Sequence, residues 1–149
     1  MKWDLEAWID FNLNAKRIYS LTFMKVTGLA WMGIRTEKYD ESIRFFKQVM
    51  QLKIKYEEKG FTVFSMPDGD TVEVFSSKSS YNTHFGSSPV VGFLVDDIEK
   101  ARQEIVKSGL ELVGKVERDE HGGAWQHFRG PDGNLYELTY NPEGAVKTV

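Results

Sequence analysis

The sequence Pro67-Asp68-Gly69-Asp70-Thr71-Val72-Glu73-Val74 returns 64 residues later as Pro131-Asp132-Gly133-Asn134-Leu135-Tyr136-Glu137-Leu138. Both copies read Pro-Asp-Gly, then three variable residues, then Glu and a branched aliphatic residue. Proline presets its φ and glycine adopts a positive φ at little cost, so each copy predicts a turn that leads into a strand. A repeat of this kind indicates that one structural unit occurs twice in the chain.

A second repeated pair lies upstream of these turns. Trp31-Met32-Gly33-Ile34 and Val90-Val91-Gly92-Phe93 are 59 residues apart, and each opens a strand-like run. The two offsets leave five extra residues in the second copy, which we place in a loop at 117–123. The link at 76–89 has six serines in fourteen residues, a composition typical of a flexible crossing. The sequence therefore predicts two modules, residues 26–77 and 89–141.

Each module shows the same order of elements, namely a strand, a helix and three strands. Apolar residues alternate along 26–36 and predict the first strand. The helix that follows has one face predicted to be buried, formed by Tyr39, Ile43, Phe46 and Met50. In the second module, Asp97 is placed to cap a helix that ends at Gly109. The remaining strands are predicted at 53–57, 61–66, 71–75, 90–95, 111–117, 124–129 and 134–140.

The composition excludes several classes of protein. The chain has 149 residues, 19 basic and 22 acidic side chains and no cysteine. Proteins that bind nucleic acid usually carry an excess of basic residues, which this chain lacks. The absence of cysteine excludes disulfides and thiolate metal sites. The longest apolar stretch, Gly28 to Ile34, is too short to span a membrane, and acidic residues interrupt the first twenty positions. We therefore expect a cytoplasmic protein that binds neither nucleic acid nor membrane.

The tandem βαβββ order with its repeated Pro-Asp-Gly-x-x-x-Glu resembles the vicinal oxygen chelate superfamily, which includes glyoxalase I, bleomycin-resistance proteins and extradiol dioxygenases. Two further sequence segments show the same resemblance: Gly-Phe-Leu-Val-Asp-Asp-Ile-Glu-Lys-Ala at 92–101 and Phe-Arg-Gly-Pro-Asp-Gly-Asn at 128–134. It implies the α+β glyoxalase/bleomycin-resistance fold, in which two modules form a cup-shaped mixed sheet around a cleft. It also implies a homodimer that binds a small molecule.

The resemblance covers residues 26–141 and leaves both ends of the chain outside it. Residues 1–25 form an N-terminal extension, and residues 142–149 form a C-terminal tail. The segment Met1 to Phe23 has two interpretations: a non-native start upstream of Met24, or an extra helix whose apolar stripe includes Leu5, Trp8 and Ile9.

The resemblance also implies four metal-ligand positions, one on each of four strands. In this chain they are Trp31, Glu73, Val90 and Glu137, so both carboxylates are present and both imidazoles are missing. An indole offers only an N–H donor and valine offers no donor atom. Glu73 and Glu137 alone hold a divalent metal only when water or other oxygens complete the shell. We therefore expect no cofactor and no metal site of the glyoxalase type.

Strand alternation places the two glutamates on the face that would line the cup, with Arg35 as the nearest countercharge in the pattern. Alternation in 124–129 puts Trp125 and His127 on the same side. His127 has three interpretations: a third metal ligand beside the glutamates, a general base, or a hydrogen-bonding wall residue. The other two histidines, His84 and His121, lie in predicted loops and are expected to be solvated.

Aromatic residues are the clearest functional signal. Trp31, Phe75 and Trp125 are predicted to line the cup, with Phe61 or Phe64 joining them according to strand phase. Aromatic walls with a few polar groups hold planar or apolar ligands, and an indole face with glutamates nearby favours a cation. The alternative is that these rings only fill the interior.

Three functional hypotheses follow. The first is metal-independent binding of a small aromatic or cationic molecule through Trp31, Arg35, Phe75, Trp125 and His127, together with the two glutamates. The second is a lyase or isomerase that uses Glu73 and Glu137 as catalytic residues with a weakly bound divalent metal. The third is a non-catalytic structural or interaction module. The fold alone does not decide among them.

Overall fold

The computed structural model describes residues 24–143, so the N-terminal segment, interpreted as either a non-native start or an extra helix, lies outside this range. The first module contains β1 (Val26–Thr36), helix α2 (Tyr39–Arg44), a π-helical turn η1 (Phe45–Val49), β2 (Lys53–Glu58), β3 (Phe61–Ser65) and β4 (Thr71–Ser76). The second contains β5 (Val90–Val95), α3 (Ile98–Lys107), β6 (Leu112–Arg118), β7 (Ala124–Arg129) and β8 (Leu135–Tyr140). The twofold strand-helix-strand-strand-strand order confirms the prediction from the repeat.

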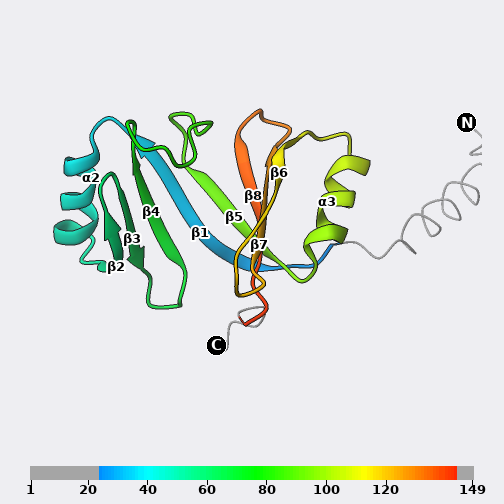
Figure 1. Ribbon diagram of the computed structural model, residues 1–149, viewed down its shortest axis with the longest axis horizontal. Coiled ribbons are helices and arrows are strands. Elements are labelled where there is room, and N and C mark those ends of the chain that lie inside the picture. Colours follow the sequence, from blue (N-terminus) through cyan, green and yellow to red (C-terminus); the bar gives the residue numbers. More distant parts are fainter. Residues whose placement is uncertain (1–23, 144–149) are drawn as a thin grey trace, which may run out of the picture.

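All eight strands form one mixed sheet in the order β2-β3-β4-β1-β5-β8-β7-β6. Within each module the first strand pairs in parallel with the last, and the modules join where β1 pairs antiparallel with β5. The sheet curves strongly, with α2 at one end of the molecule and α3 at the other (Figure 1). The α+β cup predicted by the resemblance is therefore present.

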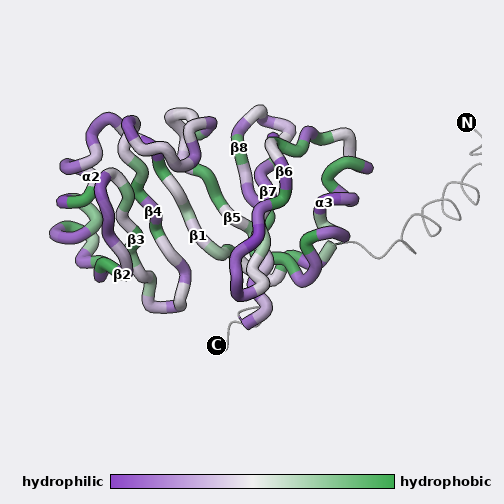
Figure 2. Tube along the Cα trace, in the orientation of Figure 1, coloured by the Kyte–Doolittle hydropathy of each residue, from purple (hydrophilic) through white to green (hydrophobic). Residues whose placement is uncertain are grey.

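Apolar residues on the outer face of the sheet pack under the helices. Beneath the first helix lie Phe46, Phe64, Val72 and Val74. Beneath α3 lies a second cluster, to which the helix itself contributes Ile98, Ala101 and Ile105. Asp97 caps α3 by accepting a hydrogen bond from the Lys100 backbone N–H at 3.0 Å, as predicted. Figure 2 shows the hydrophobic residues concentrated along the strands and the hydrophilic ones at the turns.

The first helix corrects one prediction. The segment is α-helical only as far as Arg44 and continues as the π-helical turn η1. In this turn the Met50 N–H donates a hydrogen bond to the Phe45 carbonyl. A π turn places one extra residue in the turn, so positions beyond it rotate away from the face set by a 3.6-residue period. Met50, predicted as buried, is 52% exposed, and Leu52 packs on the cluster instead.

The link between the modules, predicted as flexible, is attached to the cup at two points. The Arg35 guanidinium donates hydrogen bonds to the backbone carbonyls of Ser77, Ser79 and Tyr81 at 2.7–2.9 Å. Further along the link, Phe85 is buried beside Phe75 and Val90. The link forms a compact loop between the two halves of the cup (Figure 1).

Helices long and apolar enough to cross a membrane do not occur among residues 24–143.

Candidate functional site

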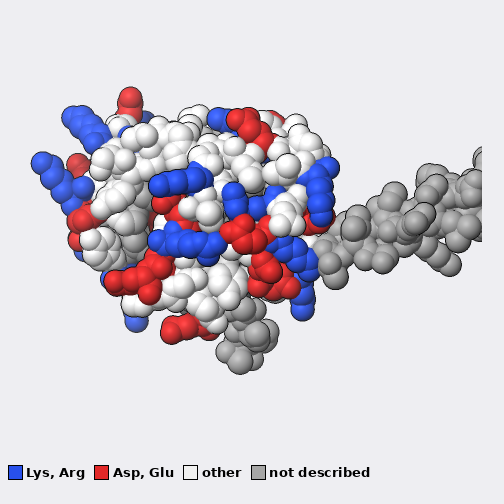
Figure 3. Space-filling model, turned by 45° about the vertical axis from the view of Figure 1, so that its right-hand side comes forward, with Lys and Arg blue, Asp and Glu red and all other residues white. Residues whose placement is uncertain are grey.

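An open cavity of about 860 Å³ lies on the concave side of the sheet. Its volume is within the ~300–1,000 Å³ usual for small-molecule sites. Its aromatic lining comprises Trp31, Tyr56, Phe61, Phe75, Tyr81 and Trp125. Its charged lining comprises Asp68, Asp70, Glu73, Asp119, Glu137 and Lys55. On the face drawn in Figure 3, basic and acidic side chains are interspersed, and neither sign forms a continuous patch.

The indole of Trp31 lies at the centre of the cavity floor. Its Nε1–H donates to Glu137 Oε1 at 2.6 Å, and Thr139 Oγ1–H donates to the same oxygen at 2.6 Å. The ring covers Gly33 on its own strand and Gly92 on β5, where an added Cβ would overlap the indole. Two glycines at equivalent positions of the repeat therefore make room for one side chain.

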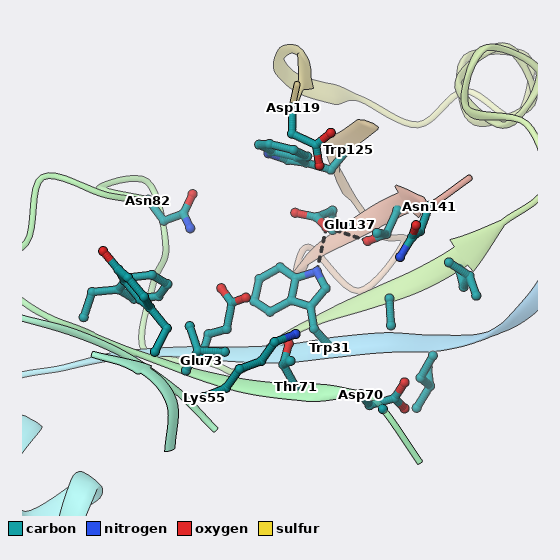
Figure 4. Close-up of a pocket in the computed structure, with 18 of the residues that line it drawn as sticks. Trp31, Lys55, Asp70, Thr71, Glu73, Asn82, Asp119, Trp125, Glu137 and Asn141 are labelled. Carbon is teal, nitrogen blue, oxygen red and sulfur yellow. Dashed lines mark hydrogen bonds between the residues drawn. The ribbon is translucent and has the colours of Figure 1, made fainter. Parts of the chain in front are cut away.

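Glu73 has a different environment, although it occupies the equivalent position in the first module. Its carboxylate lies beside the benzo edge of the Trp31 indole, whereas Glu137 lies beside the indole N–H (Figure 4). Burial raises the pKa of Glu73 to about 7, the negative charge of Glu137 adds to this rise, and Lys55 opposes it. No hydrogen bond from another residue of 24–143 stabilises this carboxylate. The two glutamates thus differ in environment: Glu137 accepts two hydrogen bonds, whereas burial favours the protonated form of Glu73.

His127 lies under the cavity floor. Its Nε2 is 3.1 Å from Glu137 Oε2, and the side chains of both residues are less than a tenth exposed. Its Nδ1 is 3.3 Å from Nε2 of His84, in the link. His127 is absent from the cavity lining. His84 is exposed, as predicted, and one side of its ring packs against His127 and Phe85.

The remaining predicted site residues divide into two groups. Phe75 and Trp125 line the cavity, and strand phase selects Phe61 for the lining while Phe64 is buried under the first helix. Arg35 is not part of the lining, because its guanidinium is bonded to the link. The countercharge expected from Arg35 comes instead from Lys55 on β2.

Several residues of the site were missed by sequence reasoning. The sequence places Lys55 on a predicted strand between Ile54 and Tyr56, so strand alternation could have given the direction of its side chain. That direction was not assigned. Asp119 and Asn82 lie in loops, where alternation gives no direction. Phe85 fills one end of the cup and stacks near Trp31, with ring centroids 6.1 Å apart. No periodic pattern marks a buried ring within a serine-rich link.

Comparison with known proteins now decides the family. The model of the Glyoxalase/Bleomycin resistance protein/Dioxygenase superfamily matches residues 28–138. The chain belongs to this superfamily. Among curated relatives, the uncharacterized protein YraH of Bacillus subtilis is 26% identical over 112 residues, which cover 67% of this chain and 88% of that protein.

Solved structures of the superfamily share the fold. Methylmalonyl-CoA epimerase from Mycobacterium tuberculosis has a TM-score of 0.60 at 19% identity, over 79% of this chain and 91% of that chain. The Mn(II)-bound glyoxalase from Novosphingobium aromaticivorans has a TM-score of 0.63 at 18% identity, over 79% of this chain and 40% of that chain. At such identities the likeness shows the fold alone.

The donor atoms of this chain do not fit the divalent metal that some superfamily members hold. Glu137 Oε1 already accepts two hydrogen bonds, and the residue at the first ligand position, Trp31, presents an N–H. Within residues 24–143, no group of three or more His, Cys, Asp or Glu side chains is arranged to hold a metal ion. The three-ligand set of Glu73, Glu137 and His127 considered from the sequence is therefore not formed.

Proposed function

We propose that this chain binds a small organic cation with a planar apolar part, without a metal, in the cavity of the cup. The observation that carries the proposal is the charge of the lining: five carboxylates against one lysine, between aromatic walls. A cation entering this cavity offsets the repulsion among the carboxylates and meets the faces of indole rings.

The two tryptophans give the cavity its apolar contact area. Trp31 forms the floor, and Trp125 faces it from β7 beside Asp119 (Figure 4). A flat ring placed between them buries apolar surface, and a charged group at its end reaches Glu73. This arrangement supports recognition of an aromatic ammonium compound over an aromatic carboxylate.

Tryptophan fluorescence tests this proposal with three matched probes: 1-naphthylmethylammonium, 1-naphthylmethanol and 1-naphthoate. We expect the ammonium probe to bind at least about tenfold more tightly than the carboxylate, a difference of about 1.4 kcal/mol. Binding should be unchanged after treatment with EDTA. Equal affinity for all three probes, or loss of binding after chelation, would overturn the proposal.

Two variants locate the binding. Trp125→Phe should weaken the ammonium probe because the distal wall loses area, and Glu73→Gln should reduce the preference for the ammonium over the carboxylate. Glu111→Gln, at an exposed position of the second module, is the matched control. The homodimer implied by the resemblance stays a prediction, which sedimentation analysis tests.

A second candidate function, proton transfer by a lyase or isomerase, is favoured by the raised pKa of Glu73. A general base is most effective when its pKa is near the working pH, and Glu73 fits this requirement inside an open cavity. An enzyme of this class would exchange the acidic C–H proton of a bound carbonyl compound with solvent.

Mass spectrometry in D₂O tests the second candidate on a panel of carbon acids that includes methylmalonyl-CoA. We expect deuterium incorporation to be abolished in Glu73→Gln and retained in Glu111→Gln. Incorporation that is equal in both variants would remove Glu73 as the base. Binding of the ammonium probe without any incorporation would leave the binding function alone.

A further inference from the structure

Three titratable side chains from three segments lie in a row beneath the cavity. The row begins at Glu137 on β8, passes through His127 on β7 and ends at His84 in the link, with separations of 3.1 and 3.3 Å between the polar atoms. Cross-strand pairing places His127 directly opposite Glu137, so the sheet fixes the first step of the row. The second step depends on how the link folds.

The row runs from the cavity to the surface. Glu137 lines the cavity, the His127 side chain is 8% exposed, and His84 is exposed. Phe85 packs edge-on against both histidine rings, with centroids 5.2 and 5.3 Å away. An apolar ring therefore shields the buried part of the row, Glu137 and His127, from water and leaves the His84 end exposed.

Hydrogen bonding indicates which nitrogen of each histidine donates a proton and which accepts one. His127 Nε2 is buried, and no residue of 24–143 other than Glu137 lies close enough to pair with it. Leaving a buried donor unpaired destabilises the fold, so a small ring rotation that turns Nε2–H toward the carboxylate is favourable. With the His127 proton on Nε2, its Nδ1 accepts from His84 Nε2–H, and His84 Nδ1 remains for water.

We propose that His84 and His127 form a proton relay that connects Glu137 with bulk water. A proton from water binds His84 Nδ1, the Nε2 proton of His84 passes to His127 Nδ1, and the Nε2 proton of His127 passes to Glu137 Oε2. One proton enters and one is delivered, and the reverse sequence carries a proton outward. Its use in turnover rests on the proton-transfer function proposed above and needs Glu137, beside Glu73, to exchange protons with the bound carbonyl compound; the relay would then reset Glu137 while a ligand fills the cavity.

The charges around the row keep His84 in the form that a relay needs. Partial desolvation of the His84 ring lowers its pKa, and His127, Arg129 and Arg35 lower it further, while Glu137 opposes them. A lowered pKa leaves the ring neutral at neutral pH, and a neutral imidazole both accepts and donates a proton.

Proton exchange measured by NMR on the ligand-free chain tests the relay. The variant His84→Phe keeps a ring in contact with Phe85 and His127 but removes both nitrogens. We expect exchange of the His127 ring N–H with water to slow about tenfold or more, because it would then require local opening of the structure. His121→Phe, in an exposed loop, is the matched control and should not change the rate. An equal or faster rate in His84→Phe would overturn the relay.

A second measurement tests the coupling at the other end of the row. Glu137→Gln removes the charge that raises the pKa of His84, so we expect this pKa to fall. An unchanged or higher pKa would contradict the relay. Both measurements need no ligand, so their failure leaves the proposed function standing, and absence of turnover leaves the relay standing.

Discussion

The indole N–H of Trp31 on β1 donates a 2.6 Å hydrogen bond to Glu137 on β8 across the intervening strand β5. Strand register places Trp31 beside Gly92 and Gly92 beside Glu137, so the side chain of Trp31 crosses over a glycine to reach its partner. The carboxylate is thereby held by a neutral donor at a position where some members of the superfamily place a metal. Five predictions follow from this arrangement and from the contacts around it.

Trp31→Phe removes the N–H while keeping an aromatic floor. Hydrogen bonds to charged groups contribute about 1.5–3 kcal/mol, so we expect a loss of unfolding free energy of this size. Urea unfolding followed by circular dichroism measures it. Trp125→Phe removes an indole that makes no hydrogen bond with residues 24–143 and should cost clearly less; equal losses would argue against a role for the Trp31–Glu137 bond.

Gly92→Ala places a methyl group where the indole of Trp31 lies. Because both the ring and the strand backbone are rigid, we expect the ring to move off the floor and a loss of about 1–3 kcal/mol. The loss should shrink in a Trp31→Ala background, where the space is empty. A double-mutant cycle on unfolding free energies measures this coupling, and additive losses would show that Gly92 is not required for the indole.

Glu73→Gln should change how stability depends on pH. A folded-state pKa of about 7 against 4.5 means that the folded chain keeps a proton that the unfolded chain has released, so this group's contribution to stability falls as pH rises from 4.5 to about 7. We expect the variant to be about 2–3 kcal/mol more stable than the parent at pH 8 and equal to it at pH 4. Denaturant unfolding at both pH values, with Glu111→Gln as control, measures the difference; a constant difference would contradict the raised pKa.

Arg35→Ala should release the link from the cup. The variant removes the hydrogen-bond donors of the Ser77, Ser79 and Tyr81 carbonyls. We therefore expect the free energy of unfolding to fall by roughly 1–3 kcal/mol. Tryptic cleavage after Lys78, within the clamped segment, should become faster. Arg118→Ala removes a surface ion pair with Glu99 and should cost less than about 1 kcal/mol. Unchanged cleavage in Arg35→Ala would show that the link is held by Phe85 alone.

The double variant Trp31→His/Val90→His restores the ligand pattern implied by the superfamily on the four adjacent strands β4, β1, β5 and β8. We expect it to retain about one Zn²⁺ or Ni²⁺ ion per chain after buffer exchange, whereas the natural chain retains none, because two imidazoles and two carboxylates suit a transition metal. Elemental analysis measures both. Stoichiometric metal in the natural chain would contradict metal independence.

Much of the fold could be predicted from the sequence because its signals are local. The Pro-Asp-Gly turns, the strands β5 and β7 and the cap at Asp97 each depend on a few neighbouring residues, and the structure confirms them. Met50 was mispredicted because the π turn before it shifts the period of the helix, and such a turn has no clear local sequence signature.

The candidate site was predicted less completely. Alternation gave the cavity-facing side of Glu73, Glu137 and Trp125, since a strand fixes which face each side chain takes. It gave neither the partner of Arg35 nor the position of His84, because long side chains and loop residues have no such constraint.

The sequence by itself determined two βαβββ modules and the presence of a glutamate at the same place in each, and its resemblance to the superfamily implied the cup. Only the tertiary structure decided that the two glutamates differ. Glu137 meets Trp31 from 106 residues away and so gains a donor, while Glu73 gains only burial and a nearby lysine. The physical reason is that a repeat copies backbone and local pattern, whereas the charge state of a carboxylate depends on the distant side chains that the curvature of the sheet and the path of the link bring beside it.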